Sequence, residues 1–516
     1  MNSSVLNKFF FVLILKFFFG FNVLFTQERP NVIIILVDDM GFSDIGSYGS
    51  EIQTPNLDFL SSNGLRFSNA YNTSKCFPSR AALLTGLYPH LIGYDKTHKI
   101  ERMKNAITLG EFFKMANYAT LWSGKHHSIE NPVTRGFDHF SGLLDGASNH
   151  FNPGLKRDGQ GKPAQKRNDK NYDQSFRKWV IEGEIISPYT PGKNFYSTDE
   201  FTNYALNWIS NQQYEEPFFL YLSYTAPHDP LMAWPEDIEK YKGKYDLGYE
   251  EIRKKRFEKQ KQLGIISQKH VLTKPDYENW NSLSLEKRKS ESKKMEVYAA
   301  MIDRIDQNIG KLINVLKSRN QLNNTLILFA SDNGGSSEDA ERPVNNVGKI
   351  GSLTNWTSLK KSWANVSNTP YKYYKNWIFE GGIKTPLIVF WPKKIRKTNS
   401  IIESHVHFID FLPTFSEILE LNYPKFYNGE NIIPLSGESF WTKMTQTDNL
   451  KRKTPLFWKW RDGKAVRLGK WKLTSQDNNW QLYNLKRDPT EINDLVLLKP
   501  RLNKKLQELY EKWYKN

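Results

Sequence analysis

Five short apolar runs, separated by amphipathic helical patterns, leave few folds open to this chain. The runs are rich in β-branched and aromatic residues, and they occupy residues 32–37, 118–123, 218–224, 325–330 and 386–391. A strand that is apolar at successive positions is buried on both faces, which is typical of a parallel sheet covered by helices on each side. The sequence therefore predicts an α/β fold in which a large, mainly parallel sheet is sandwiched by helices.

Three of the expected helices can be placed from their end signals. Residues 54–64 begin with Thr-Pro and end with Asn-Gly, which start and stop a helix. Thr108 and Glu111 have the spacing of a capping box at the start of a second helix. The longest helix has apolar residues along one face from 298 to 316 and leads directly into the strand at 325–330. This order predicts a crossover connection between parallel strands.

Chain length and a change of pattern predict two unequal parts. Single cores stop growing at about 250–300 residues, so we expect an α/β domain over residues 27–435 and a C-terminal subdomain over 436–516. The subdomain is β-rich from 454 to 486 and closes with an amphipathic helix at 497–514, so it predicts a small antiparallel sheet plus one helix. Residues 234–294 are Lys-rich and weakly periodic, which predicts a solvated, basic helical insertion; a substrate-facing role is the alternative.

Residues 1–26 indicate a signal peptide for export. The stretch from Phe9 to Phe25 is almost entirely apolar, but Lys16 and Asn22 interrupt it. It is also shorter than the ~20 residues that a membrane-spanning helix needs, although an uncleaved anchor remains the alternative. We expect an exported protein, with the periplasm as its destination and secretion or the cell surface as alternatives, and with no membrane association beyond the signal.

Net charge and cysteine content limit which partners and which kinds of cysteine site are possible. The chain of 516 residues has 72 Lys+Arg against 55 Asp+Glu, a formal net charge of +17. Such a surplus favours an anionic partner, namely nucleic acid, acidic lipid, or a sulfated or carboxylated sugar. The single cysteine, Cys76, excludes an intramolecular disulfide and a thiolate metal cluster.

Polar residues follow four of the predicted strands, where binding sites gather in open α/β sheets. Taken singly, each could be a turn residue, a helix cap or a surface charge. Together, the carboxylate and amide oxygens suit a hard cation such as Ca²⁺ or Mg²⁺ rather than zinc. The residues are Asp38-Asp39, Lys125-His126-His127, His228 and Asp332-Asn333.

Cys76 lies where a helix is expected to begin. Pro78 in a first turn and the following Ala-Ala-Leu-Leu predict a helix amino terminus, whose free N–H groups favour an anion. An unmodified thiol there would be a nucleophile. A buried structural cysteine is the alternative, but Pro78, Ser79 and Arg80 argue against an apolar pocket.

The segment Cys76-Phe-Pro-Ser-Arg, followed by Leu-Leu-Thr-Gly, resembles the signature of the type I sulfatases of the alkaline phosphatase superfamily. In that family a maturation enzyme converts the cysteine to Cα-formylglycine (3-oxoalanine). His126 departs from the family pattern, which has Trp there, and Phe77 replaces a smaller residue. Six other segments resemble parts of the family's pattern. They are the Asp-pair strand (31–41), the Gly-Lys-Trp-His segment (124–127), the Ala-Pro-His strand end (217–230), the second metal loop (331–334), the Glu-Gly-Gly segment (375–386) and the C-terminal sheet (465–489).

The resemblance implies a sulfuric ester hydrolase that uses one Ca²⁺. Asp38, Asp39, Asp332 and Asn333, together with the modified residue 76, would hold this ion. A hydroxyl of the hydrated aldehyde would then attack the sulfur of a sulfate ester.

The remaining roles also come from the resemblance. Arg80, Lys125 and Lys375 would neutralise the sulfate oxygens, and Arg80 would also hold the hydrated aldehyde. His228, with Lys375, would bind the substrate and protonate the leaving oxygen. His127, which the resemblance favours over His126, would take the proton whose removal releases sulfate. Ser148 would contact sulfate, unless it is simply a loop residue.

Two other functions stay open at this point. A phosphomonoester or phosphonate hydrolase of the same superfamily would normally have Ser or Thr at position 76. A non-catalytic protein that binds sulfated glycans would tolerate loss of Cys76 and of the Asp pair. For a sulfatase that is exported, basic and 14% aromatic, the expected substrate is a sulfated carbohydrate: a glycosaminoglycan or an algal polysaccharide such as ulvan, carrageenan or fucoidan, or their oligosaccharides. The expected partners are this substrate and the maturation enzyme, and nucleic acid is not expected.

Overall fold

The computed structural model describes residues 29–95, 103–167, 177–213, 216–339, 343–446 and 450–515. The predicted signal peptide lies outside these residues. None of the helices within the described ranges is both long enough and apolar enough to cross a membrane.

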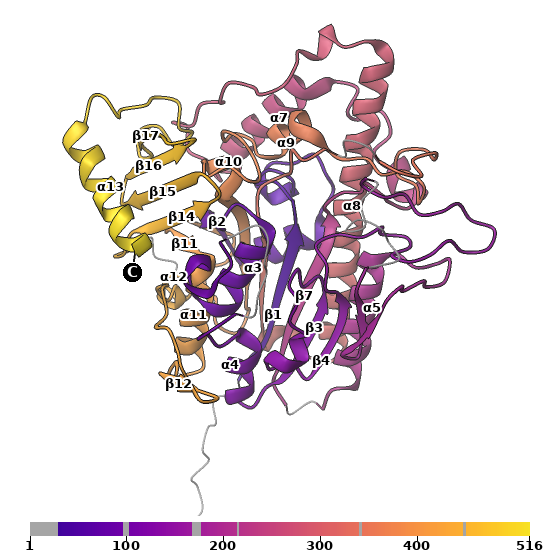
Figure 1. Ribbon diagram of the computed structural model, residues 1–516, viewed down its shortest axis with the longest axis horizontal. Helices are drawn as coiled ribbons and strands as arrows, with labels where there is room; N and C mark the ends of the chain where they lie inside the picture. Colours follow the sequence, from indigo (N-terminus) through magenta and orange to yellow (C-terminus); the bar gives the residue numbers. More distant parts are fainter. Residues whose placement is uncertain are drawn as a thin grey trace, which may run out of the picture.

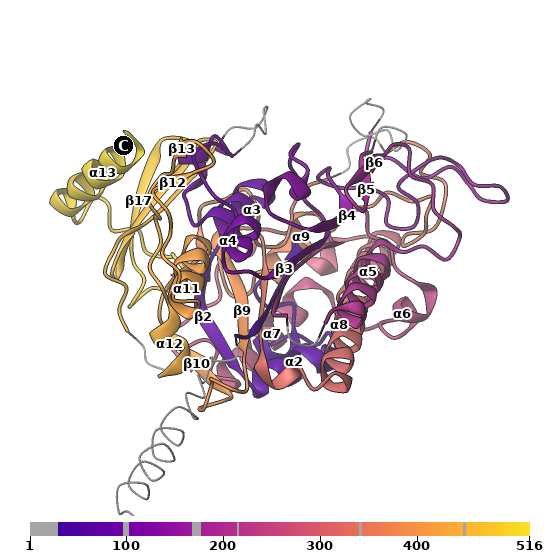
Figure 2. The same ribbon diagram turned by 90° about the horizontal axis from the view of Figure 1, so that it is seen from below.

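A large sheet runs through the molecule, with helices on both faces (Figures 1 and 2). Its order in the described chain is β10-β2-β9-β8-β1-β7-β3-β4-β5-β6, with β11 beside β2. The central strands β8, β1, β7 and β3 are parallel neighbours, whereas β9 is antiparallel to both β8 and β2. The predicted α/β fold with a mainly parallel sheet is therefore confirmed. The strands are β1 (Asn31–Asp38), β2 (Leu65–Tyr71), β3 (Ala119–Gly124), β4 (His139–Leu143), β5 (Trp179–Ile181), β6 (Glu184–Ile186), β7 (Phe218–Pro227), β8 (Thr325–Ser331), β9 (Lys384–Phe390), β10 (Ser400–Ile402) and β11 (Val406–His407).

Alternate side chains of the central strands pack into two separate cores. In β1, Val32, Ile34 and Leu36 belong to one core cluster, whereas Ile33 and Ile35 belong to the other. A strand must be apolar at every position to fill both cores, which explains the continuous apolar runs in the sequence. The helices are α2 (Pro55–Ser62), α3 (Cys76–Thr85), α4 (Leu109–Met115), α5 (Ser197–Asn211), α6 (Pro235–Glu239), α7 (Gly248–Gln262), α8 (Leu285–Ser318), α9 (Lys360–Ser367), α10 (Glu380–Ile383), α11 (Phe411–Ile418), α12 (Trp441–Thr445) and α13 (Pro500–Lys515).

The insertion at 234–294 is helical but not wholly solvated. It contains α6, α7 and the start of α8, and Tyr245 and Tyr249 are buried in the second core cluster. Arg256 is fully buried as well, and it pairs with Asp44 at 2.5 Å and with Glu51 at 2.7 Å. The expectation of a solvated excursion is wrong for this face, because tyrosine and paired arginine do not register as apolar in the sequence.

The C-terminal sheet and its helix agree with the prediction. Four antiparallel strands, β14 (Leu456–Trp460), β15 (Gly463–Leu468), β16 (Trp471–Gln476) and β17 (Asn479–Asn484), carry α13 beside them. Within the β-rich stretch at 454–486, Gly469, with φ +57°, turns the chain between β15 and β16. A separate two-stranded sheet is formed by β12 (Phe426–Tyr427) and β13 (Glu430–Asn431).

Candidate active site

The residues that follow four neighbouring strands come together at one edge of the large sheet. β8, β1, β7 and β3 are adjacent and parallel, so their carboxyl ends share this edge. Cys76 and Arg80 of α3 and Lys375 of the loop before α10 join them. We call the whole set the strand-end cluster, and each member is less than a tenth exposed. Its members are Asp38, Asp39, Cys76, Arg80, Lys125, His228, Asp332, Asn333 and Lys375.

Cys76 is the first residue of α3, and it lies among these charges. It is 1% exposed, and the N-cap residue makes no side-chain bond to the helix end. Burial lowers the pKa values of Arg80 and Lys375 and raises that of Asp332, and nearby carboxylates raise all three. A smaller contribution from charge at Cys76 also raises each of them. The predicted neighbourhood of Cys76, a helix start beside cations, is therefore present.

Three cations neutralise three carboxylates within the cluster. Arg80 Nε donates to Asp332 Oδ2 at 2.8 Å, Lys375 Nζ to Asp39 Oδ2 at 2.8 Å, and Lys125 Nζ to Asp38 Oδ2. This local neutrality is what permits complete burial of so many charges.

The carboxylates nevertheless shift one another's pKa values. Burial, reinforced by the charge of Asp38, raises the pKa of Asp332 well above its usual range, and Arg80 only partly opposes this rise. Burial also opposes ionisation of Asp38, but Lys125 and His228 hold its pKa below the usual range. A divalent cation between these groups would relieve the repulsion.

Two buried oxygens of the cluster accept no hydrogen bond from any described residue. They are Asp38 Oδ1 and Asn333 Oδ1. The Asn333 amide is oriented by its nitrogen, which donates to Asp39 Oδ1 at 2.6 Å and to the Gly334 carbonyl at 2.9 Å. An oxygen left without a partner in the interior is costly, and a hard cation would satisfy both atoms. The donor set therefore fits Ca²⁺ better than a soft metal.

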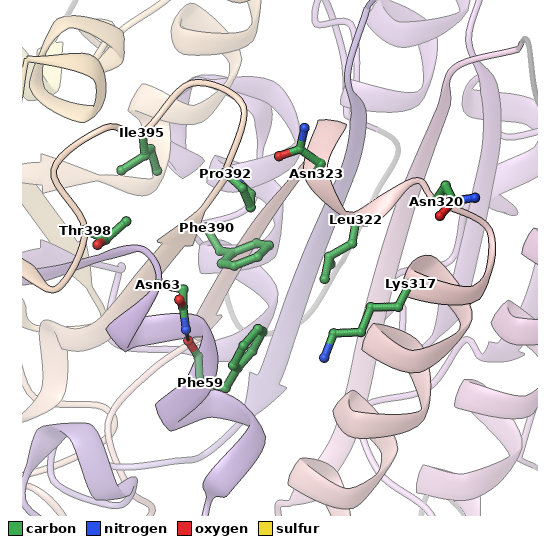
Figure 3. Close-up of a pocket in the computed structure, with 10 residues that line it drawn as sticks. All are labelled: Phe59, Asn63, Lys317, Asn320, Leu322, Asn323, Phe390, Pro392, Ile395 and Thr398. Atoms are coloured by element: carbon green, nitrogen blue, oxygen red, sulfur yellow. Dashed lines mark hydrogen bonds between the residues drawn. The ribbon is translucent and has the colours of Figure 1, made fainter.

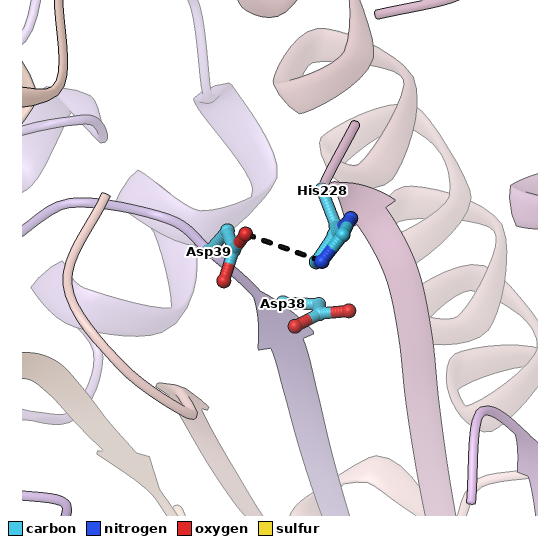
Figure 4. Close-up of side chains that lie close together, drawn as sticks. All are labelled: Asp38, Asp39 and His228. Carbon is cyan, nitrogen blue, oxygen red and sulfur yellow. Dashed lines mark ion pairs between the residues drawn. The ribbon is translucent and has the colours of Figure 1, made fainter. Parts of the chain in front are cut away.

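His228 lies close enough to this set to be considered as a ligand (Figure 4). Atoms of Asp38, Asp39 and His228 all lie within 4.8 Å of one another. However, His228 Nδ1 is 2.8 Å from Asp229 Oδ1, and Nε2 is 3.5 Å from Asp39 Oδ2. Although burial disfavours the charged ring, Asp39 and the other carboxylates raise the pKa of His228 to about 9. A protonated imidazole is a proton donor and not a metal ligand.

The two histidines after β3 occupy different environments. The His126 ring packs edge-on against Trp122, with centroids 4.7 Å apart, and burial lowers its pKa to about 3. His127 is half-buried, has φ +65°, and its ring lies 5.7 Å from that of Phe77, next to Cys76. Burial, followed by the charge of Lys125, holds the pKa of His127 well below the usual range. A neutral imidazole near residue 76 can accept a proton, whereas His126 faces the aromatic core.

Ser148 is buried, but no hydrogen bond between it and the cluster is found among the described residues. Its neighbour His150 is closer to the chemistry, because His150 Nε2 lies 3.1 Å from the His228 carbonyl oxygen. Sequence reasoning also missed Asp229, which adjoins His228, and Glu338, whose Oε1 lies 2.7 Å from Lys75 Nζ and 3.7 Å from Lys375 Nζ. Glu338 follows the same strand as Asp332, so its position in the loop could have drawn attention to it.

The C-terminal sheet supports the site from the side. The Trp460 ring packs edge-on against Phe77, with centroids 5.3 Å apart, and its Nε1 donates to Asn376 Oδ1 at 3.0 Å. Trp458 Nε1 donates to the Asn72 carbonyl at 2.8 Å. β14 therefore contacts both the start of α3 and the loop that carries Lys375.

Another cavity, of about 470 Å³, opens at the opposite edge of the sheet (Figure 3). Its lining includes Phe59, Leu322 and Phe390 and no carboxylate. Lys317 is the titratable residue of this lining, and its Nζ lies 4.8 Å from the centre of the Phe59 ring. This cavity lacks the groups for catalysis and is not the candidate site.

Comparison with known proteins places the chain among enzymes that hydrolyse sulfate esters. A family model described as Sulfatase matches residues 30–421, and one described as N-sulphoglucosamine sulphohydrolase, C-terminal, matches 371–515. An uncharacterised sulfatase of Schizosaccharomyces pombe is 31% identical over 96% of this chain and 94% of its own length. An arylsulfatase of Klebsiella aerogenes is 34% identical over 80% and 91%. The crystal structure of Ps i-CgsB in complex with k-i-k-neocarrahexaose is 28% identical, with a TM-score of 0.68, over 94% of this chain and 93% of that one.

Proposed function

The chain belongs to the sulfatase family, and we propose that it removes sulfate from a sulfated carbohydrate with the help of one Ca²⁺ and a formylglycine formed from Cys76. That the chain is a sulfatase, a sulfuric ester hydrolase, follows from the family itself. The observation that supports the mechanism is the position of Cys76 at the start of α3, within a buried cluster that has three carboxylates, two lysines, an arginine and a histidine. A carbohydrate substrate is supported by the relative bound to neocarrahexaose and by the match to a glucosamine sulfohydrolase domain.

The chain's own residues would prepare the site as follows. Asp38, Asp39, Asp332 and Asn333 would hold the ion, because their oxygens include the two unpaired ones. When in place, Ca²⁺ would polarise a sulfate oxygen and formylglycine would supply the nucleophilic hydroxyl.

Three buried cations would neutralise the sulfate. Arg80, Lys125 and Lys375 are each held by one carboxylate, and each carries several N–H donors, so the remaining donors can bind sulfate oxygens. Because the cluster excludes water, these charges act in a medium of low dielectric constant, where they stabilise the transition state more strongly than in water.

Two imidazoles in opposite protonation states would move the protons. His228 is held through Nδ1 by Asp229, and its protonated ring would donate to the leaving alkoxide of the sugar. His127, whose imidazole is neutral, would accept the proton when residue 76 returns to the aldehyde. Ser148 remains a proposed sulfate contact.

Sulfate release from defined sulfated oligosaccharides, with matching phosphate esters as controls, tests this proposal. Protein produced together with a maturation enzyme should release sulfate, and the peptide containing position 76 should have the mass of the aldehyde. An intact thiol with full activity would refute the mechanism. Preferential hydrolysis of the phosphate esters would favour the phosphomonoester or phosphonate hydrolase, and binding without turnover would favour the glycan-binding protein.

We also propose export to the periplasm, from the apolar leader at residues 1–26. Cell fractionation, followed by N-terminal sequencing of the mature protein, tests this. Recovery in the cytoplasm with the leader intact would contradict it.

A further inference from the structure

A second pocket lies between the large sheet and the C-terminal sheet. Its volume is about 780 Å³, within the ~300–1,000 Å³ that ligand sites usually occupy. No member of the strand-end cluster lines it. The large domain contributes β2, the loop after α7, Tyr371, α10, the start of β9 and the segment between β10 and β11 to its lining. The C-terminal part contributes the segment before β14, the start of β14, Arg467 of β15, and the loops after β15 and β17.

The lining of this pocket is strongly cationic. Five lysines and two arginines face only two glutamates, Glu380 and Glu403. Two of these charges are already paired with residues outside the lining: Glu380 with Lys472 at 2.9 Å, and Arg452 with Asp410 at 2.5 Å. The lysines and Arg467 still leave a surplus of positive charge in a concave space, which concentrates anions. We call it the cationic pocket, and its cations are Lys269, Lys384, Lys451, Arg452, Arg467, Lys470 and Lys486.

The floor and the rim of the cationic pocket differ in how far their cations are exposed. On the floor, Lys384 is 4% and Arg467 8% exposed. Lys384 Nζ donates to Tyr371 Oη at 2.7 Å, and Arg467 Nη2 lies 2.5 Å from His405 Nε2. The rim, by contrast, consists of the exposed lysines Lys269, Lys451, Lys470 and Lys486. A buried, hydrogen-bonded floor with exposed cations around it suits a ligand that carries several separate anionic groups.

We propose that the cationic pocket binds a sulfated carbohydrate chain at a place distinct from the catalytic cluster; this rests on the proposed function. Sulfate groups would contact the rim lysines, and sugar hydroxyls would bond to the polar groups of Ser68, Asn69, Ser267 and Thr454, which line the same space. A concave pocket of this size accepts a few sugar rings, whereas a flat basic face would suit a lipid surface. Binding here would raise the local concentration of a sulfated polymer at the enzyme.

Calorimetric titration of a short sulfated carrageenan oligosaccharide, a tetrasaccharide, tests the proposal. Turnover is prevented with Cys76→Ala in the full chain, which removes the nucleophile. Two sets of substitutions are compared in this background. The rim set combines Lys451→Ser, Lys470→Ser and Lys486→Ser. The control set replaces three exposed lysines elsewhere, Lys254→Ser, Lys289→Ser and Lys505→Ser. Both sets remove the same charge. We expect the rim set to abolish one of two binding events or weaken it by about tenfold or more at low salt, and the control set to change it by less than about twofold.

The same two sets in the active enzyme separate this inference from the proposed function. With 4-nitrophenyl sulfate, the rim set should leave kcat/KM unchanged, whereas KM for the sulfated polymer should rise. Equal losses in the rim and control sets would overturn the proposal, as would equally tight binding of the desulfated tetrasaccharide, of inorganic sulfate or of anionic lipid vesicles. If no substrate releases sulfate, the proposed function fails, but the titration still reports on the pocket.

Discussion

Two oxygen atoms of the strand-end cluster indicate that the site binds a cation. Asp38 Oδ1 and Asn333 Oδ1 are buried and accept no hydrogen bond from the part of the chain that the structure describes, so a bound cation should stabilise the fold as well as assist catalysis. We expect chelation with EGTA to lower the melting temperature by several degrees and added Ca²⁺ to restore it.

In Asp38→Asn this response to Ca²⁺ should disappear, and sulfate release should fall by about 10²–10³-fold or more. Asp462→Asn, at an exposed carboxylate, is the control. A Ca²⁺ response that survives in Asp38→Asn would remove this residue from the proposed ligand set.

A second residue-scale prediction concerns the leaving group. If His228 donates the proton, His228→Gln should reduce hydrolysis of a sugar sulfate by about 10²–10⁴-fold. The loss should be much smaller for 4-nitrophenyl sulfate, because nitrophenolate leaves without a proton. His139→Gln, at a partly exposed ring, is the control. Equal losses on both substrates would show that His228 does not act as the acid.

The charge of His228 also predicts a pH dependence of stability. Asp39 and its neighbours raise the pKa of His228 from 6.5 to about 9 in spite of burial. The protonated ring therefore stabilises the fold fully below about pH 6.5, and this contribution is lost as the pH rises through 9. The urea midpoint of the wild type should fall more steeply between these values than that of His228→Gln. Parallel curves would contradict this.

The sequence predicts which residues lie together where they follow directly after a strand. The acids, the amide and His228 follow apolar runs, so fold class alone gathers them. Glu338 and Asp229 escaped notice because their importance comes from contacts such as Glu338 with Lys75, 263 positions away. No local pattern encodes such a contact.

At the scale of elements, end signals proved dependable. The capping box at α4 is present: Glu111 N donates to Thr108 Oγ at 3.2 Å, and Thr108 N donates to Glu111 Oε2 at 2.7 Å. Thr108→Ala should therefore lower the free energy of unfolding by about 1 kcal/mol, measured by urea titration. Thr108→Ser keeps the hydroxyl and should stay near the wild type. If Thr108→Ser lowers the free energy of unfolding as much as Thr108→Ala does, the methyl group of Thr108, and not its capping hydroxyl, stabilises the fold.

Elements that mix polar and apolar residues were the hardest to predict from the sequence. β2 contains Arg66, Ser68 and Asn69 among its apolar residues, so it shows no continuous run. The buried face of α7 includes Arg253 and Arg256. Arg256 pairs with Asp44 and Glu51, which lie far away in the sequence, and Arg253 donates to Thr273 in the loop after α7. Burial by pairing leaves no hydrophobic period along the chain.

For the molecule as a whole, one core joins the two predicted parts. Leu456, Trp458 and Val466 of the C-terminal sheet belong to the same cluster as Val32 of β1 and Phe77 of α3. We therefore expect the parts to unfold together. Far-ultraviolet circular dichroism and tryptophan fluorescence should give coincident urea transitions. Two separated transitions would show that residues 436–516 fold independently.

The contact of Trp460 with Phe77 also sets an order of events in biogenesis. In the folded chain Cys76 is 1% exposed, and the residue beside it is covered by the last sheet to be synthesised. The folded chain leaves a maturation enzyme almost no access to this thiol. We therefore expect the modification proposed for Cys76 to come before β14 packs against α3, and a chain that folds first to keep the Cys76 thiol.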